Sequence, residues 1–371
     1  MRDRIPSRFF VSAAAAALFC SAAVVAQQPA PAPQDKKPAA AGGIPRTPDG
    51  NPDLQGTYDL GTITPMERAA GTPLVLTPEQ ARKQEQAVAA RNAQGDAPVA
   101  ADRAAPPKGG DGSPGPYGNV GGYNNFWLDP GSRFTVIDGQ ARASLLIDPP
   151  DGRVPPMRAD ARARNAARRD AYTSDQRVNE DDPGFEGPDA YNDPEQRPLG
   201  ERCLVGFSST SGPPILPTYF YNNLHQIVQT PTQVMILTEM VHDARVIRMN
   251  DRHLPSNIRK WLGDSIGHWE GDTLVVDTTN FTSKTRFRGS SENLHVVERF
   301  TRLDAKTLRY QFTIEDAATW DRAWTAEYAW PATPERIYEY ACHEGNYALG
   351  NILRGARLKE KDEATKTKEP R

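Results

Sequence analysis

Short apolar runs, each closed by a turn signal, dominate the chain from residue 126 onward. The runs FWLDPG, RFTVIDG and ASLLIDPPDG all contain Asp next to Pro or Gly, which is typical of antiparallel strands joined by tight turns. Further strand-like runs are YFYNNLHQIVQ, QVMILTEMV, ARVIRM, DTLVVDTTNF, LHVVERFTRL, TLRYQFTIED, TAEYAW and RIYEYACHE. This succession predicts a series of strands connected by hairpins, with hardly any helix between residues 200 and 345.

Strict alternation within these runs indicates a sheet that is buried on one face. Leu308, Tyr310, Phe312 and Ile314 alternate with polar residues. No rhythm of strand, helix and strand appears between the runs. The pattern therefore predicts a mainly β fold, either an antiparallel β-barrel of lipocalin-like type or a β-sandwich, with one or two peripheral helices and long loops.

Helix signals are few and lie outside the strand-rich region. The segment Thr77-Pro78-Glu79-Gln80 combines an N-cap, a proline at the first helical position and a capping-box glutamine, and predicts a helix near 78–94. An Arg-rich run predicts a second helix over 159–172. Segments 95–122 and 173–200 lack periodicity and predict long loops. We expect one β-rich domain over 44–355 and a disordered charged tail over 356–371.

The N-terminal residues predict an export signal. Three arginines precede an apolar run, and small residues follow it, so we expect a signal peptide over 1–26 that is cleaved after Ala26. Lipidation of Cys20 is the alternative. A Pro/Ala-rich linker is expected over 27–43. The sequence thus predicts a periplasmic or secreted protein without a membrane span.

Two cysteines remain after the predicted cleavage, Cys203 and Cys342. An oxidising compartment permits a disulfide, and we expect these two residues to form one. Catalytic use of the adjacent Cys342 and His343 is the alternative, but neighbouring residues of a strand point to opposite faces.

Composition narrows the classes of function. The formal net charge is −3, and no basic block lies in the predicted domain, so a nucleic-acid partner is not expected. The chain has no Gly-x-Ser-x-Gly elbow, phosphate loop or dinucleotide fingerprint, and no cofactor is predicted. A metal site is not expected either. Glu239 and His242 lie three positions apart, and such a pair shares a face only on a helix.

Histidine, arginine and amide side chains provide the candidate chemistry. For a catalyst, the predicted general bases are His225, His295 and His343, and the predicted anion-stabilising groups are Arg299 and Arg245. For a binding protein, the predicted ligand-binding residues are Tyr221, Asn222, Asn223, Glu239, His242, Trp324 and Tyr340. Tyr338, like Tyr221 and Tyr340, could line an aromatic pocket for such a ligand.

Several motifs together resemble a known family. The segments TPDGNPDLQG, SLLIDPPDGRVPP, YNNLHQIVQT, WEGDTLVVDTTNF, LHVVERF and YACHEGNYAL are similar to those of a large family of secreted bacterial proteins described as hypothetical. The similarity spans residues 44 to 355 and assigns no catalytic residue. The motifs DLQGTY and WEGDTLVV also resemble lipocalin-type barrels, in which a short Gly-x-aromatic strand begins the barrel.

The leading hypothesis is that the protein is a β-barrel that binds a small apolar or aromatic ligand. A cofactor-independent lyase or hydrolase that uses a histidine base is the first alternative. A surface module that binds a glycan or a protein is the second alternative, and it predicts exposed aromatic residues. The sequence leaves the oligomeric state open.

Overall fold

The computed structural model describes residues 43–95, 129–170, 191–206, 209–218, 221–284 and 287–366. The predicted signal peptide, nearly all of the predicted linker and most of the two predicted long loops lie outside the described residues. No helix among the described residues is long and apolar enough to cross a bilayer.

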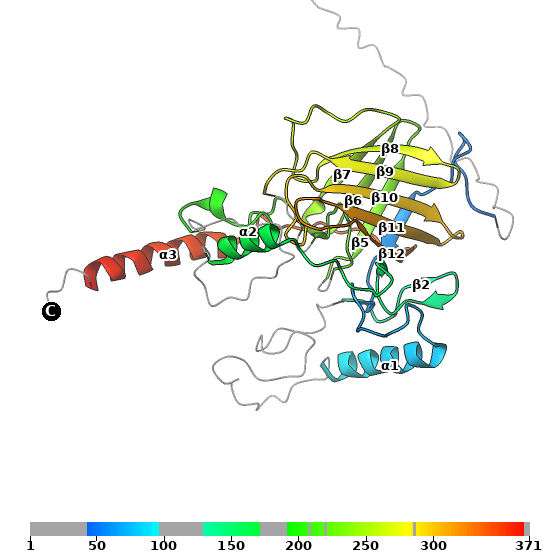
Figure 1. Ribbon diagram of the computed structural model, residues 1–371, viewed down its shortest axis with the longest axis horizontal. Coiled ribbons are helices and arrows are strands. Elements are labelled where there is room, and N and C mark those ends of the chain that lie inside the picture. The colour runs from blue at the N-terminus through cyan, green and yellow to red at the C-terminus, as the bar shows by residue number, and fades with distance from the viewer. Residues whose placement is uncertain are drawn as a thin grey trace, which may run out of the picture. The chain divides into compact units, whose positions relative to one another are not determined.

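One ten-stranded sheet forms the body of the described chain (Figure 1). Its strands, in spatial order, are β1 (Gly56–Asp59), β5 (Leu224–Gln229), β6 (Gln233–Thr238), β7 (Ala244–Met249), β8 (Asp264–Glu270), β9 (Thr273–Thr279), β10 (His295–Arg302), β11 (Thr307–Glu315), β12 (Trp324–Pro331) and β4 (Leu146–Asp148). Neighbouring strands are antiparallel except β7 and β8, which pair in parallel at two positions. A two-stranded sheet of β2 (Val136–Ile137) and β3 (Gln140–Ala141) is separate. The predicted mainly β fold is confirmed.

The hairpin of β10 and β11 shows why the sequence folds in this way. Buried and half-buried residues alternate along both strands, and the register places Phe300 opposite Tyr310. The turn closes when the backbone N–H of Leu303 donates to the carbonyl of Thr307 at 2.9 Å. The side chain of Asp304 accepts from a backbone N–H inside the turn, at 2.7 Å. The alternating pattern thus sets which face is buried, and the Asp turn sets the register.

The sheet curls but does not close as a continuous barrel. Its first strand, β1, meets the end of β12 in a single bridge between Tyr58 and Ala332. One further hydrogen bond joins the two segments there, from the N–H of Thr333 to the carbonyl of Thr57 at 2.9 Å. A full ladder of hydrogen bonds would be needed to remove both sheet edges. The structure is therefore a half-barrel, and the closed lipocalin-like form that we expected is not seen.

Large side chains fill the concave side of the sheet. The buried core includes Trp324, Trp330, Tyr310, Phe312 and Phe300, each at most 1% exposed. The ring centroids of Tyr310 and Trp330 are 4.9 Å apart, and those of Phe300 and Tyr310 are also 4.9 Å apart. Aromatic side chains thus occupy the space where a closed ligand cavity was expected.

Three α-helices accompany the sheet in the described part of the chain. In α1 (Pro78–Gly95) the predicted capping box is present, because the side chains of Thr77 and Gln80 each accept a hydrogen bond from the other residue's backbone N–H. The second predicted helix corresponds to α2 (Ala159–Asp170). The third, α3 (Tyr347–Lys366), covers most of the tail that we expected to be disordered. Its first part carries Tyr, Leu and Ile side chains, so helical signals precede the charged run.

At the level of the strands, one expected strand is not seen and one strand of the large sheet was not expected. Residues 337–341, within the run RIYEYACHE, are not a strand, although their apolar and polar positions alternate. Strand β8 was missed, because Gly267 interrupts its apolar pattern. A Cβ atom at position 267 would come within 3.0 Å of Ile247 and Met249 on β7. The close approach of β8 to β7 therefore requires glycine at this position.

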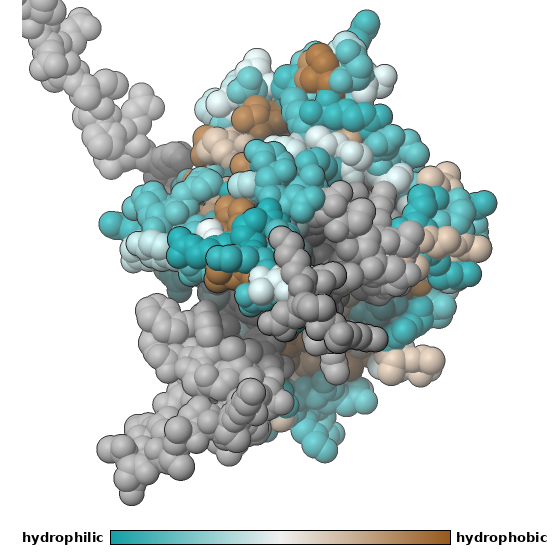
Figure 2. All heavy atoms as spheres, turned by 90° about the vertical axis from the view of Figure 1, so that its left-hand side faces the viewer, coloured by the Kyte–Doolittle hydropathy of each residue, from teal (hydrophilic) through white to brown (hydrophobic). Residues whose placement is uncertain are grey.

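The surface is mostly polar on the face shown in Figure 2. Hydrophilic residues dominate there, and the apolar patches that can be seen outside the grey atoms are small and separate. This part of the surface presents no broad apolar area of the kind that protein partners cover.

Candidate functional site

Three strand ends meet beside an open pocket. Asp59 ends β1, Asn222 and Asn223 precede β5, and Glu239 follows β6. Because β1 and β6 both run antiparallel to β5, the ends of these two strands lie next to the start of β5. The register confirms this, since Asp59 pairs with Leu224.

This acidic pocket has a volume of about 290 Å³. Four acidic residues, Asp59, Asp129, Glu239 and Glu335, line it together with one basic residue, Arg336, and with Asn222, Asn223, Leu224, Tyr221 and Tyr338. Four carboxylates face one basic group, so the pocket is strongly negative.

Two polar side chains of the acidic pocket are almost fully buried. Glu239 is 4% exposed, and its carboxylate accepts a hydrogen bond from the backbone N–H of Tyr338 at 3.1 Å. Asn223 is 5% exposed, and its amide nitrogen donates to the carbonyl of Asp129. The amide oxygen of Asn223 has no hydrogen-bond partner among the described residues. Buried acceptors of this kind are costly unless a partner satisfies them.

The charge of the acidic pocket also affects Asp59. Burial raises the pKa of its carboxyl, and the neighbouring carboxylates of Asp129, Glu335 and Glu239 raise it further, although a hydrogen bond from the N–H of Gly61 opposes the shift. A cation inside the pocket would reverse the effect of the carboxylates. The electrostatics thus favour positive charge at this position.

A second pocket adjoins the first and is built around the disulfide. The sulfur atoms of Cys203 and Cys342 are bonded, as predicted, with 5.8 Å between their Cα atoms. This disulfide pocket has a volume of about 510 Å³. Its wall contains the disulfide, Tyr221, Asn222, Tyr340, Asn346, Glu201 and Glu339.

The two pockets adjoin each other, because Tyr221 and Asn222 belong to the walls of both, and we refer to them together as the cleft. The apolar part of the cleft is held by a small cluster in which Tyr221, Tyr340 and Cys342 pack against the buried Met240 and its neighbours. The disulfide ties residues 338–346, which run along the cleft, to the segment around Cys203. The cleft thus combines aromatic and disulfide surface with an acidic end.

Most of the predicted ligand-binding residues lie in this cleft. Its walls include Tyr221, Asn222, Asn223, Glu239 and Tyr340.

Two of the predicted ligand-binding residues lie elsewhere. Trp324 is fully buried in the core, where its ring stacks on Phe287 with 5.8 Å between centroids. His242 is exposed at the end of a short 3₁₀ helix and is not among the residues that line the cleft.

The sequence reasoning missed Asp59, Asp129, Glu335 and Arg336. Asp59 could have been found from its place at the end of the strand in LQGTYDL. The other three lie in irregular segments, and no local pattern of the sequence marks them.

The predicted catalytic residues do not gather at one site. His225 is 1% exposed, with its ring nitrogens 3.1 Å from the carbonyl of Asn223 and 3.0 Å from that of Thr210. Burial lowers the pKa of His225 to about 4, so the ring is neutral at neutral pH and donates to only one of these carbonyls. His343 is exposed, on the segment that follows Cys342.

Arg245 lies on the concave side and is bound in a buried network. Its guanidinium contacts both carboxylate oxygens of Glu298, at 2.5 and 2.9 Å. The hydroxyl of Tyr310 donates to the same carboxylate at 2.7 Å and accepts from the N–H of Ile215 at 2.9 Å. The ion pair of Arg245 and Glu298 connects β7 and β10 through the interior of the protein. The guanidinium of Arg245, which we predicted to stabilise an anion, is thus already bound to the carboxylate of Glu298.

His295 and Arg299 lie on the outer face of β10. The ring of His295 bridges Asp277 at 3.0 Å and Glu315 at 3.0 Å. Hydrogen bonding and attraction to Asp277, supported by Glu315, raise the pKa of His295 to about 9 despite partial burial. His295 therefore holds its proton at neutral pH, which opposes a role as general base. Arg299 pairs with Glu270 at 2.6 Å.

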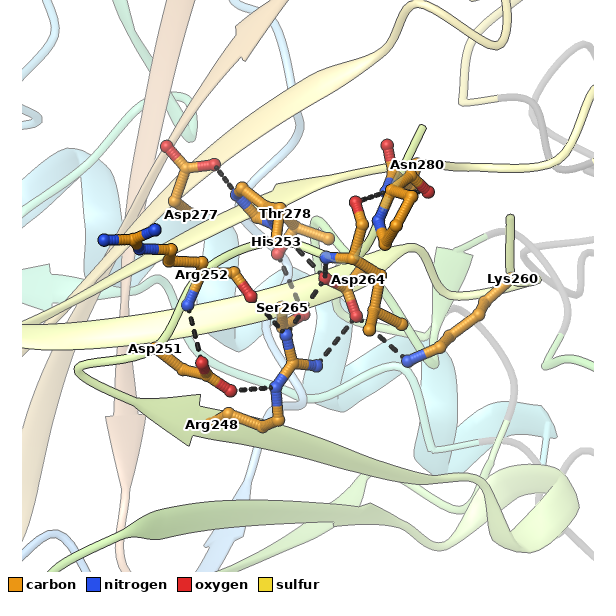
Figure 3. A network of polar contacts seen from close by, with 12 residues as sticks. Arg248, Asp251, Arg252, His253, Lys260, Asp264, Ser265, Asp277, Thr278 and Asn280 are labelled. Carbon is orange, nitrogen blue, oxygen red and sulfur yellow. Dashed lines mark hydrogen bonds and ion pairs between the residues drawn. The ribbon is translucent and has the colours of Figure 1, made fainter. Parts of the chain in front are cut away.

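The outer face also carries a network that the sequence reasoning missed (Figure 3). Its centre is the fully buried side chain of Asp264, which accepts from Arg248 at 2.8 Å and from Lys260 at 3.0 Å. Burial would raise the pKa of Asp264, but these hydrogen bonds outweigh it and hold the pKa well below its usual range. His253 joins Asp264 to Asp277, which contacts His295 in turn.

This network braces the connection between β7 and β8. The backbone N–H of Leu254 also donates to Asp264, at 3.0 Å, so the connecting segment is held against the start of β8. No group of His, Cys, Asp or Glu residues in the described part of the chain is arranged to hold a metal ion. We interpret the network as structural, because paired groups satisfy its charges.

Comparison with models of protein families, with curated proteins and with solved structures finds no match. The geometry of the cleft is therefore the basis for a proposal about function.

Proposed function

We propose that the protein binds a small organic molecule with an aromatic or apolar body in the cleft formed by the acidic and disulfide pockets. One observation carries the proposal: two adjoining pockets share Tyr221 and Asn222, and their combined wall contains most of the ligand-binding residues that the sequence predicts. Ligand sites typically combine aromatic surface with a few convergent polar groups, and this cleft does so.

The binding site lies at the end of the strands, outside the half-barrel interior. Aromatic side chains fill the concave side, whereas the cleft is open to solvent. The exposed ring of Tyr338, 73% accessible, lies at its rim. A ligand can enter such a site without opening the core.

Export to an oxidising compartment is part of the proposal. The disulfide supports it, because such bonds persist mainly outside the reducing cytosol. The enzyme hypothesis and the glycan-binding or protein-binding hypothesis stay predictions, as does membership of the family that the sequence motifs resemble.

The test is isothermal titration calorimetry with three aromatic compounds of similar shape: 2-phenylethylamine, 2-phenylethanol and phenylacetate. We expect saturable one-to-one binding of at least one compound and its loss in Tyr340→Ala, which removes an aromatic wall of the cleft. Tyr347→Ala is the control, because this exposed tyrosine lies outside both walls. If none of the three compounds binds, or if Tyr340→Ala binds like the wild type, the proposal is wrong.

A further inference from the structure

We infer that the ligand of this cleft carries a primary ammonium group, which sits in the acidic pocket between Glu239 and Asn223. The inference rests on the proposed function and specifies the class of ligand.

The acidic pocket carries an excess of negative charge. Asp59, Asp129, Glu239 and Glu335 line the acidic pocket, and none of them forms an ion pair with a described basic residue. The single guanidinium in the wall, from Arg336, leaves most of this charge uncompensated. Charged groups in partly buried sites attract a counter-charge strongly, because solvent screens them less than it does at the surface.

Independently of the net charge, two buried side chains in the wall of the acidic pocket have few hydrogen-bond partners. Glu239 is 4% exposed, yet the only hydrogen bond that its carboxylate accepts from a described residue comes from the N–H of Tyr338. The buried amide oxygen of Asn223, in the same wall, has no partner among the described residues. Buried carboxylates are nearly always paired. A ligand group with several N–H donors would satisfy both acceptors together.

The spacing of the acidic groups favours an organic cation over a metal ion. No three carboxylates or histidines among the described residues are close enough to share one ion. The four carboxylates surround a volume of about 290 Å³, which suits a group larger than a bare ion. A quaternary ammonium would leave Glu239 and Asn223 without donors, whereas a primary ammonium supplies three.

The rest of the cleft fits the body of such a ligand. Tyr221 lies in the walls of both pockets, so the body of a ligand whose ammonium group sits in the acidic pocket would lie against this ring, on the side of the disulfide pocket. An ammonium group near the faces of tyrosine rings gains a further attraction from their quadrupoles. Tyr340 and the disulfide then provide apolar surface for an aromatic or aliphatic body.

The experiment compares the amine with its neutral and anionic analogues by calorimetry. We expect 2-phenylethylamine to bind the wild type at least about tenfold more tightly than 2-phenylethanol, which corresponds to about 1.4 kcal/mol. Phenylacetate should bind more weakly than either compound, because the carboxylates repel it.

Two variants locate the ammonium group. Glu239→Gln should lower the affinity for the amine by about tenfold and change the affinity for the alcohol by less than about twofold. Asp59→Asn should lower the affinity for the amine in the same direction, and it serves as the second variant if Glu239→Gln does not fold. Glu344→Gln is the matched control, because this exposed carboxylate lies on the same segment of chain but outside both walls of the cleft. It should leave the preference for the amine intact.

The outcomes separate this inference from the proposed function. If the alcohol or the acid binds in the cleft as tightly as the amine, the inference fails and the proposed function stands. The inference also fails if Glu239→Gln and Asp59→Asn both bind the amine like the wild type, or if calcium chloride displaces the amine stoichiometrically. If no compound binds, the proposed function fails and the inference fails with it.

Discussion

Replacing Glu298 by Gln should destabilise the protein strongly, because it breaks a buried ion pair while keeping the shape of the side chain. The side chains of Arg245 and Glu298 are 4% and 0% exposed. The carboxylate accepts from the two terminal nitrogens of the guanidinium and from the hydroxyl of Tyr310. In Glu298→Gln the guanidinium of Arg245 stays buried without a counter-charge.

The expected loss of unfolding free energy is about 3 to 5 kcal/mol, the range measured when one partner of a buried pair is removed. This is a large part of the 5 to 15 kcal/mol that typically stabilises a folded protein. Urea unfolding with the disulfide intact, followed by far-ultraviolet circular dichroism, measures it. With an m value of about 3 kcal/mol/M, the midpoint should fall by about 1 to 1.7 M.

Two controls make the result specific to the buried pair. Glu270→Gln removes the partner of Arg299 in an exposed pair and should change the midpoint far less. The double variant Arg245→Leu/Glu298→Leu removes both buried charges and should recover most of the stability that the single variant loses. If Glu298→Gln loses no more stability than Glu270→Gln, the interior pair does not carry the stability that we assign to it.

Three further predictions concern the backbone, the disulfide and pH. Gly131→Ala should lower the unfolding free energy by more than about 2 kcal/mol, because both the positive φ and contact with the backbone near Gly61 oppose a side chain. Gly139→Ala, which also has a positive φ but open space around it, should lower it by about 1 kcal/mol. Equal losses in urea unfolding would contradict this. Replacing Cys203 and Cys342 by Ser should lower stability by about 2 to 5 kcal/mol, and an unchanged urea midpoint would oppose this. Because the folded-state pKa of His295 is raised to about 9, its charge contributes fully below pH 6.5, and that contribution is lost as pH rises toward 9. The stability difference between wild type and His295→Gln should therefore shrink over this range, and a constant difference would refute the assignment.

The strands of the sheet could be predicted because their alternation is local. In β11 every second residue from Leu308 to Ile314 is buried, and both the sequence pattern and the structure have this period. The capping box at Thr77 is local in the same way, and the structure contains it. Closure is different, since the bridge between Tyr58 and Ala332 joins residues far apart in the chain. No local pattern of the sequence therefore indicates how far the sheet curls.

The candidate site could be predicted in part, for the same reason. The polar cluster that precedes β5 indicated Tyr221, Asn222 and Asn223, because amides before a strand are visible in the sequence. Pairing between strands brings Asp59 beside them, and an irregular segment brings Arg336, so their contribution depends on the tertiary structure. The same limit applies to His295, whose protonation depends on Asp277 and Glu315 on the neighbouring strands.

A crystal structure of the protein soaked in 2-phenylethylamine tests the central claim most directly. The account predicts the ammonium nitrogen within hydrogen-bond distance of the carboxylate of Glu239 and the amide oxygen of Asn223. It also predicts the aromatic ring beside Tyr221, directed toward the disulfide of Cys203 and Cys342. Amine bound at another place, or a cleft that stays empty when the compound is saturating in solution, would contradict the account.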